Sequence, residues 1–165
     1  GGRRGGTEPP LGEADRRAQA WAKTGQVAWR DAGLRHAPPE VLAAAGAARV
    51  LDLAGNSLTE LPLPACPSLQ RVVLSRNSLA EAPAAVLALG GSLQVLHLER
   101  NAIAALPAAV GGLQSLKELR LSHNRLVALP EEVGTLTSLE VLSLSHNSLA
   151  ALPSLLAGGA GPVAS

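Results

Sequence analysis

The sequence is poor in the residues on which many small domains rely for stability. Its 165 residues include one cysteine, two tryptophans and no phenylalanine, tyrosine or methionine. A single cysteine excludes an intramolecular disulfide, and small secreted domains usually carry several, so we expect an intracellular, cytoplasmic chain. Because 47% of the residues are apolar, and almost all of these are leucine, alanine or valine, small aliphatic side chains must fill the core of one globular domain.

The sequence also lacks strong net charge and long apolar runs. A formal net charge of +1 gives no strong steering toward nucleic acid or an anionic membrane. No run approaches the roughly 18 apolar residues of a membrane-spanning helix, and the opening GGRRGGTEPP has no apolar signal-peptide core. We interpret residues 1–10 as a flexible tail, because GGRRGG has no interleaved aromatic residues, and we expect neither a nucleic acid nor a membrane partner.

What the sequence does contain is a repeat anchored on asparagine. Residues 119–130 read LRLSHNRLVALP, and residues 142–153 read LSLSHNSLAALP. Aligned on asparagine, five copies follow one another at intervals of 21, 24, 23 and 23 residues, and their anchors are Asn56, Asn77, Asn101, Asn124 and Asn147. Apolar residues precede each anchor by eight, five and three positions and follow it by two and five, with a proline next. Such a fixed period predicts a stack of similar structural units.

A sixth, degenerate copy precedes these five. The stretch VAWRDAGLRHAP, residues 27–38, keeps the apolar register but has Ala32 in place of the anchor, 24 residues before Asn56. A second apolar row lies nine positions after the anchor position and consists of Val41, Val86, Val110, Val133 and Leu156. The unit anchored on Asn56 is shortened after its anchor, and we predict that Ala65 fills the position of this row in that unit.

The pattern LxxLxLxxNxLxxLP, over residues 26–153, resembles that of the leucine-rich repeat family. The resemblance implies an α/β solenoid, a horseshoe arc with a parallel β-sheet on the concave face and short helical or extended segments on the convex face. Independently, the alternation of apolar residues five and three before the anchor predicts one short strand per repeat, about 4.8 Å from the next. No single repeat buries its own leucines, so the repeats are stable only when they stack on one another.

The anchor asparagines are predicted to be structural. Where each strand turns inward, backbone N–H and C=O groups lose their ladder partners, and each unpaired buried group costs about 1–3 kcal/mol. A side-chain amide both donates and accepts hydrogen bonds, so we expect a ladder of amides from coil to coil, as the resemblance also implies. The proline that ends each copy steers the chain onto the convex side.

The two ends of the array are expected to differ. Residues 11–24 are predicted to form a capping helix that covers the first coil, ended by Gly25. Its apolar face would hold Leu11, Ala14, Ala18 and Trp21. This opening also resembles that of short intracellular leucine-rich repeat proteins. Six repeats then occupy residues 25–153. Residues 154–165 are glycine-rich, and we expect an uncapped tail there. Either the array is truncated, which we favour, or a partner docks end-on against the last coil.

No constellation for catalysis or cofactor binding is evident. His97, His123 and His146 are not accompanied by cysteines or a convergent carboxylate set at zinc-like spacing. The serines recur with the repeat, and neither a GxSxG elbow nor a GxxxxGK phosphate loop is present. We therefore predict a chain that is not an enzyme and carries no metal or cofactor.

The outward strand positions are the candidates for function, because packing does not fix their identity. They lie six, four, two and one residues before each anchor and carry mixed charges, with a basic and histidine-bearing column along one edge. The family resemblance implies that this concave sheet holds partner proteins. The predicted partner-binding residues are Arg71, Val73, Arg76, His97, Glu99, Arg100, Arg120 and His123. The alternative is a structural subunit of a large assembly, such as a cytoskeletal or ciliary complex; partner identity and oligomeric state do not follow from the sequence.

Overall fold

The computed structural model describes residues 12–154 and 163–164. Short strands alternate with short helices or extended segments along the chain. The elements are α1 (Glu13–Thr24), β1 (Gln26–Ala28), α2 (Pro39–Ala45), β2 (Val50–Asp52), β3 (Arg71–Val73), α3 (Ala84–Leu87), β4 (Val95–His97), η1 (Ala108–Gly112), β5 (Glu118–Arg120), η2 (Glu131–Thr135), β6 (Val141–Ser143) and β7 (Val163–Ala164).

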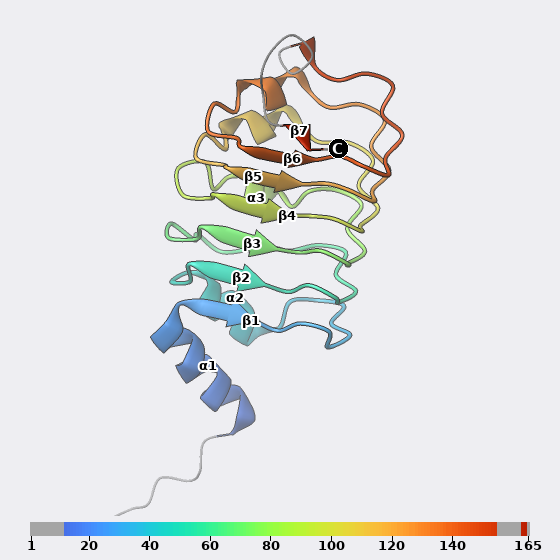
Figure 1. The fold of residues 1–165 in the computed structure, drawn as a ribbon. Helices are drawn as coiled ribbons and strands as arrows, with labels where there is room; N and C mark the ends of the chain where they lie inside the picture. Colours follow the sequence, from blue (N-terminus) through green and yellow to red (C-terminus); the bar gives the residue numbers. More distant parts are fainter. Residues whose placement is uncertain (1–11, 155–162, 165) are drawn as a thin grey trace, which may run out of the picture.

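The strands form one sheet in sequence order, and every neighbouring pair is parallel. They stack as successive turns of a coil, with α2 and α3 behind the sheet (Figure 1). The register follows the asparagine anchors, since Leu51 lies opposite Val72 and Val72 opposite Leu96. The convex segments are short α-helices of seven residues or fewer, 3-10 helices or extended chain, because few residues separate each proline from the next strand. The predicted solenoid with a parallel sheet is therefore confirmed.

The inward positions of the repeat form one continuous core. In the coils of β3, β4 and β5, the residues eight, five and three before the anchor and two after it are all fully buried, at 0% exposure. In the coil of β6, Leu144 is 8% exposed, and Leu139 and Leu149 are only partly buried. Burial is thus most complete where a complete described coil lies on both sides, as expected for an array whose units bury one another's apolar side chains.

The second apolar row differs from the sequence prediction at one position. Val41, Val86 and Val110 are fully buried, but Ala65 is exposed and Cys66 takes the buried place, at 2% exposure. In this shortened unit the chain crosses the convex side without a helix. An extended chain covers more distance per residue than a helix, so the residue that meets the core is not the one found by counting from the anchor. Leu156 lies outside the described residues.

The N-terminal helix lies against the first coil. Helix α1 ends at Gly25, which has a φ of 68°, and Trp21 is its buried residue. The Trp21 and Trp29 rings are 6.3 Å apart, and the Arg17 guanidinium lies 3.8 Å from the centre of the Trp29 ring. Leu11 lies outside the described residues. The two tryptophans join the helix to the array.

The C-terminal end differs from the uncapped tail predicted from the sequence. Val163 and Ala164 form β7, which pairs with β6 through Leu142 opposite Val163 and Ser143 opposite Ala164. The other residues after Ser154 lie outside the described part. A strand needs only backbone N–H and C=O groups to cover a sheet edge, so a glycine-rich composition was a poor guide to whether this edge is paired.

Candidate functional site

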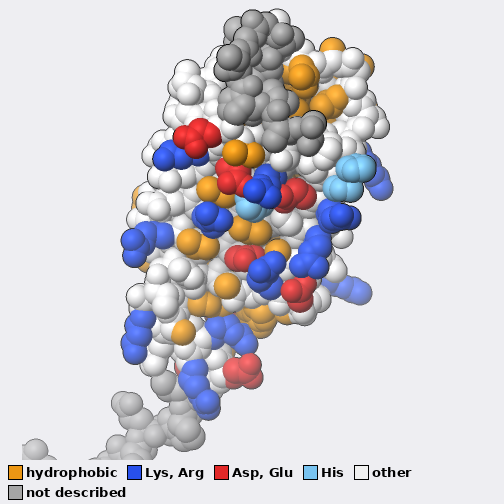
Figure 2. Space-filling view, viewed as in Figure 1, with side chains coloured by type: hydrophobic (Ala, Val, Ile, Leu, Met, Phe, Trp, Pro, Cys, Tyr) orange, Lys and Arg blue, Asp and Glu red, His pale blue; other side chains and the backbone are white. Residues whose placement is uncertain are grey.

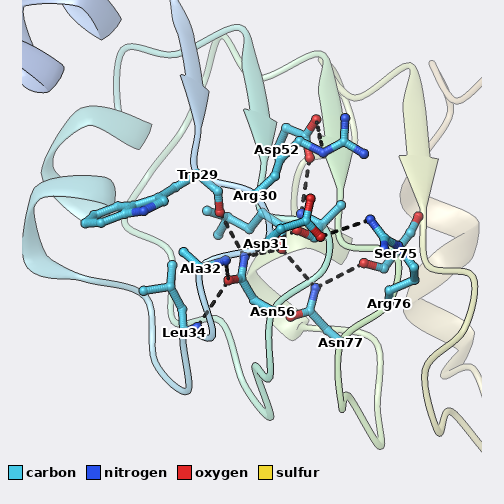
Figure 3. A network of polar contacts seen from close by, with 12 residues as sticks. Trp29, Arg30, Asp31, Ala32, Leu34, Asp52, Asn56, Ser75, Arg76 and Asn77 are labelled. Carbon is cyan, nitrogen blue, oxygen red and sulfur yellow. Dashed lines mark hydrogen bonds and ion pairs between the residues drawn. The ribbon is translucent and has the colours of Figure 1, made fainter.

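The anchor asparagines bind each coil to the one before it (Figure 3). Asn56 Nδ2 donates to the carbonyl of Leu53 in its own coil and to that of Trp29 in the preceding coil, both at 2.8 Å. Asn56 Oδ1 accepts the backbone N–H groups of Ala32 at 3.0 Å and Leu34 at 3.1 Å. One side chain thereby pairs four backbone groups.

The same bonds recur around Asn77, Asn101, Asn124 and Asn147. Each amide donates to the carbonyl three residues earlier and to the equivalent carbonyl of the preceding coil, at 2.9–3.1 Å. Each Oδ1 accepts an N–H from the preceding coil at 3.0–3.1 Å. Among the described residues, no buried side-chain nitrogen or oxygen lacks a partner. The amide groups of the asparagines are therefore hydrogen-bonded to the backbone within the array.

The residue immediately before the anchor has a positive φ in every coil. The values are 51° for Asp31, 72° for Gly55, 55° for Arg76, 55° for Arg100, 57° for His123 and 57° for His146. A non-glycine residue pays roughly 1–2 kcal/mol for this left-handed conformation. We name Arg76, Arg100, His123 and His146 the edge row, because they follow one another on adjacent coils at the edge where the strands end.

Gly55 allows an ion pair between coils that are not neighbours. Asp31 Oδ1 lies 3.2 Å from Arg76 Nη2 (Figure 3), and this pair joins the first coil to the third. A Cβ atom at Gly55 would lie 1.9 Å from Asp31 Oδ1 and 3.1 Å from Arg76 Nη2. The pair forms because the coil between has no side chain at this position.

A second polar network crosses the middle of the sheet face, centred on Glu118. Its Oε1 lies 2.9 Å from His97 Nε2 and also accepts a hydrogen bond from Arg120 Nε. Arg120 Nε is 4.0 Å from Glu99 Oε1, and Ser75 Oγ donates to Glu99 Oε2 at 2.5 Å. Side chains of three successive coils are thereby held in fixed positions.

The carboxyl group of Glu118 is stabilised in its ionised form. Burial raises the pKa of this carboxyl, but the hydrogen bonds from His97 and Arg120 and their positive charges outweigh burial, so its pKa lies below the usual value. Glu118 is therefore ionised at neutral pH.

The predicted partner-binding residues separate into three groups. His97, Glu99 and Arg120 belong to the central network. Arg76, Arg100 and His123 belong to the edge row. Arg71 and Val73 lie at the two ends of β3, on either side of the buried Val72.

Two members of the central network were missing from the sequence prediction. Glu118 and Ser75 lie six and two residues before their anchors, so the repeat register already placed them on the face. Their role depends on which neighbouring side chains they reach, and the register does not show this. In Figure 2 acidic and basic side chains are interspersed over this face, with hydrophobic ones between them.

The histidines of the edge row stack on one another. The rings of His123 and His146 are 4.0 Å apart and inclined by 11°. Partial burial, and then the charges of Arg100 and His146, lower the pKa of the His123 imidazole. In residues 12–154 and 163–164, no group of three or more His, Cys, Asp or Glu side chains could hold a metal ion. No helix in the same residues has the length and apolar character needed to cross a membrane.

Family models of this repeat match most of the array. The model described as "Leucine rich repeat" covers residues 67–126, "Leucine Rich repeats (2 copies)" covers residues 114–156, and a single "Leucine Rich Repeat" covers residues 48–69. Among curated proteins, Plant intracellular Ras-group-related LRR protein 7 of Oryza sativa subsp. japonica is 40% identical over 72 residues. That match spans 42% of this chain and 28% of the rice protein, so the chain matches less than a third of that relative.

Solved structures show the same architecture. A leucine-rich repeat protein of Leptospira interrogans aligns with a TM-score of 0.67 and 32% identity, over 75% of this chain and 32% of its own. A chain of the Toll–Spätzle complex of Drosophila aligns at 0.66 with 27% identity, over 74% of this chain and 17% of its own. YopM from Yersinia enterocolitica, at 0.67 and 24% identity, covers 95% of this chain and 33% of its own, and shows the fold alone.

Proteins built from this repeat generally mediate protein–protein interactions and are typically not enzymes. The asparagine ladder, the parallel sheet and the matches to the repeat models agree with one another. The chain belongs to the leucine-rich repeat family.

Proposed function

We propose that this chain is a non-catalytic protein-interaction module that binds a partner protein through the concave face of its sheet. The proposed contact residues are those predicted from the sequence: Arg71, Val73, Arg76, His97, Glu99, Arg100, Arg120 and His123. We further propose that it acts inside the cell, which the likeness to a rice protein named as intracellular supports.

The central network around Glu118 is the observation that carries this proposal. The side chains of His97, Glu99 and Arg120 are linked across adjacent strands, with exposed fractions of 16%, 20% and 45%. They are thus partly ordered by one another before a partner arrives. A face whose side chains are already held loses less conformational entropy on binding. The ladder of asparagines beneath it fixes the spacing of the coils.

A pair of valines offers a matched test. Val73 lies on the proposed face and is half-buried, whereas Val127 is 60% exposed and lies beyond the anchor of its coil, outside the strands. Each would be replaced by a photo-crosslinking amino acid, and the variants would be irradiated in lysate from the source cells. We expect one partner to be captured from position 73 and not from position 127. Capture should fall when Arg120→Glu is added to the variant at position 73, with the circular dichroism spectrum unchanged.

Two results would remove the proposal. One is equal capture of the same protein from both positions. The other is full retention of the partner by the Arg120→Glu variant with an intact spectrum.

The second candidate function is a structural subunit of a larger assembly, buried through its convex side. A hollow of about 660 Å³ beside α3 favours it, because its lining is mostly alanine, including Ala84, Ala88 and Ala105. A third crosslinker, at the exposed Ala105, separates the two functions. Capture from Ala105 alone would support burial in an assembly and exclude binding at the concave face.

A further inference from the structure

The carboxylates on the sheet face already have partners within the chain. Each described Asp or Glu at a face position lies within 4.0 Å of a guanidinium or imidazole nitrogen, in the pairs Asp31–Arg76, Asp52–Arg30, Glu99–Arg120 and Glu118–His97. By contrast, the side chains of Arg71 and Arg100 have no hydrogen bond or ion pair within the described part of the chain. The described face therefore has arginines without a carboxylate partner, and no carboxylate without a basic partner.

One of the two unpaired arginines, Arg100, belongs to the edge row. The backbone N–H groups of Arg76, Arg100 and His123 each donate to a carbonyl of the next coil, at 2.9–3.0 Å, so these residues follow one another at the spacing of the strands. Arg76 is already paired with Asp31, and no carboxylate lies in the row from Arg100 to His146. Figure 2 shows Lys and Arg side chains followed by histidines along the edge toward which the strands of Figure 1 point.

The charged neighbours of His123 would favour a bound anion. Its neighbours in the row are Arg100 on one side and the stacked ring of His146 on the other. Partial burial is the largest cause of the lowered pKa of His123, and both neighbours lower it further because they disfavour another positive charge. An anion over the row would relieve this repulsion and favour the imidazolium form.

We infer that the edge row, Arg76 to His146, is the binding site for an acidic segment of the partner protein. This inference rests on the proposed function and gives the partner its chemistry. Coils lie about 4.8 Å apart, and side chains on one face of an extended segment recur about every 6.6–7 Å. These two spacings differ, so a carboxylate of the segment would pair first with Arg100 and would reach Arg76 only in competition with Asp31. The guanidinium of arginine forms charge-assisted and often bidentate bonds with carboxylates.

A labelled oligoglutamate peptide tests the inference, with oligoglutamine of equal length as the uncharged control. Binding to the whole chain would be measured by fluorescence anisotropy at low salt. We expect oligoglutamate to bind and oligoglutamine not to bind. Arg100→Glu should weaken oligoglutamate binding by about tenfold or more, and Arg100→Gln should weaken it less. The two variants keep the inference testable if one of them does not fold, as judged by circular dichroism.

Lys117→Glu is the matched control. Lys117 is exposed, has no side-chain partner in residues 12–154, and lies just before β5, at the opposite edge of the sheet. It makes the same charge change away from the edge row, so we expect a loss of no more than about threefold from the weaker overall field. Equal losses for Lys117→Glu and Arg100→Glu would show nonspecific attraction and overturn the inference.

The pH dependence of oligoglutamate binding gives an independent test. Oligoglutamate should bind more tightly at pH 6 than at pH 7.5, because the bound anion favours proton uptake by His123 while the glutamates stay ionised. His123→Gln should reduce this pH dependence. An unchanged pH dependence would count against binding of the acidic segment at the edge row.

Two further outcomes identify the source of the anion and separate the two proposals. Tighter, Arg100-dependent binding of duplex DNA or phosphatidylserine vesicles than of oligoglutamate would overturn the assignment to a protein segment. A partner that crosslinks at position 73 but is not displaced by oligoglutamate would leave concave-face binding standing and remove the acidic segment. Displacement by oligoglutamate would support both.

Discussion

Replacing Asn124 with alanine removes three hydrogen bonds at once, two to the preceding coil and one within its own coil. Asn124 Nδ2 donates to the carbonyls of Leu98 and Leu121, both at 2.9 Å, and its Oδ1 accepts the N–H of Ile103 at 3.1 Å. Asn124 is only 9% exposed, so water cannot readily replace all three. At about 1–3 kcal/mol for each buried group left unpaired, and with some relaxation, the expected loss in free energy of unfolding is about 3–5 kcal/mol.

Urea unfolding of the whole chain, followed by far-ultraviolet circular dichroism, measures this loss through the midpoint and slope. The control is Arg125→Ala at the next residue, which is exposed and should change stability by no more than about 0.5 kcal/mol. Leu121→Ala, at a fully buried leucine, gives the scale of a core deletion, about 2–5 kcal/mol. A loss below about 1 kcal/mol for Asn124→Ala, with an unchanged slope, would refute the ladder argument.

Three further predictions follow from single side chains. The pKa of His123 is lowered, first by partial burial and then by Arg100 and its stacked neighbour, so its contribution to stability is present above the unfolded-state pKa and is lost as the pH falls through the folded-state value. Urea midpoints should therefore fall less between pH 7 and pH 5 for His123→Gln than for the wild type, and equal falls would contradict this. Burial raises the pKa of the Cys66 thiol, so a thiol reagent at pH 8 should modify it slowly in the native chain and rapidly in urea; rapid native modification would refute its placement. Ala32→Asn should change stability by no more than about 0.5 kcal/mol, because the Trp29 carbonyl already accepts from Asn56; a gain above about 1 kcal/mol in urea unfolding would contradict this.

The core could be predicted from the sequence because the same packing problem is solved in every coil. Leu74, Leu98 and Leu121 occupy one place in the template, and each is fully buried. Where the units differ in length, the template no longer identifies the inward residue, and Cys66 replaced the expected Ala65 for this reason. The period fixes positions along the strand, but the path across the convex side depends on whether that segment is helical or extended.

The candidate face was only partly predictable. The register placed His97 and Arg120 on the face, and their positions did not reveal that Glu118 would accept hydrogen bonds from both. Such a contact depends on how far each side chain reaches toward the neighbouring coil, and two residues with the same register can choose different partners. The left-handed backbone of the edge row was also hidden, because arginine does not signal a positive φ and histidine, although enriched there, adopts it only in a minority of cases.

The direction of the ladder explains why the first copy of the repeat lacks its asparagine. Each anchor amide reaches backward, so Asn56 already accepts the N–H of Ala32 and donates to the carbonyl of Trp29. An amide at position 32 would have to reach beyond β1, the edge strand of the sheet. There α1 presents a different surface, and the contact is made by Trp21 against Trp29. The first coil therefore needs no asparagine at its anchor position. It contacts α1 by aromatic packing and not by hydrogen bonds to a preceding coil.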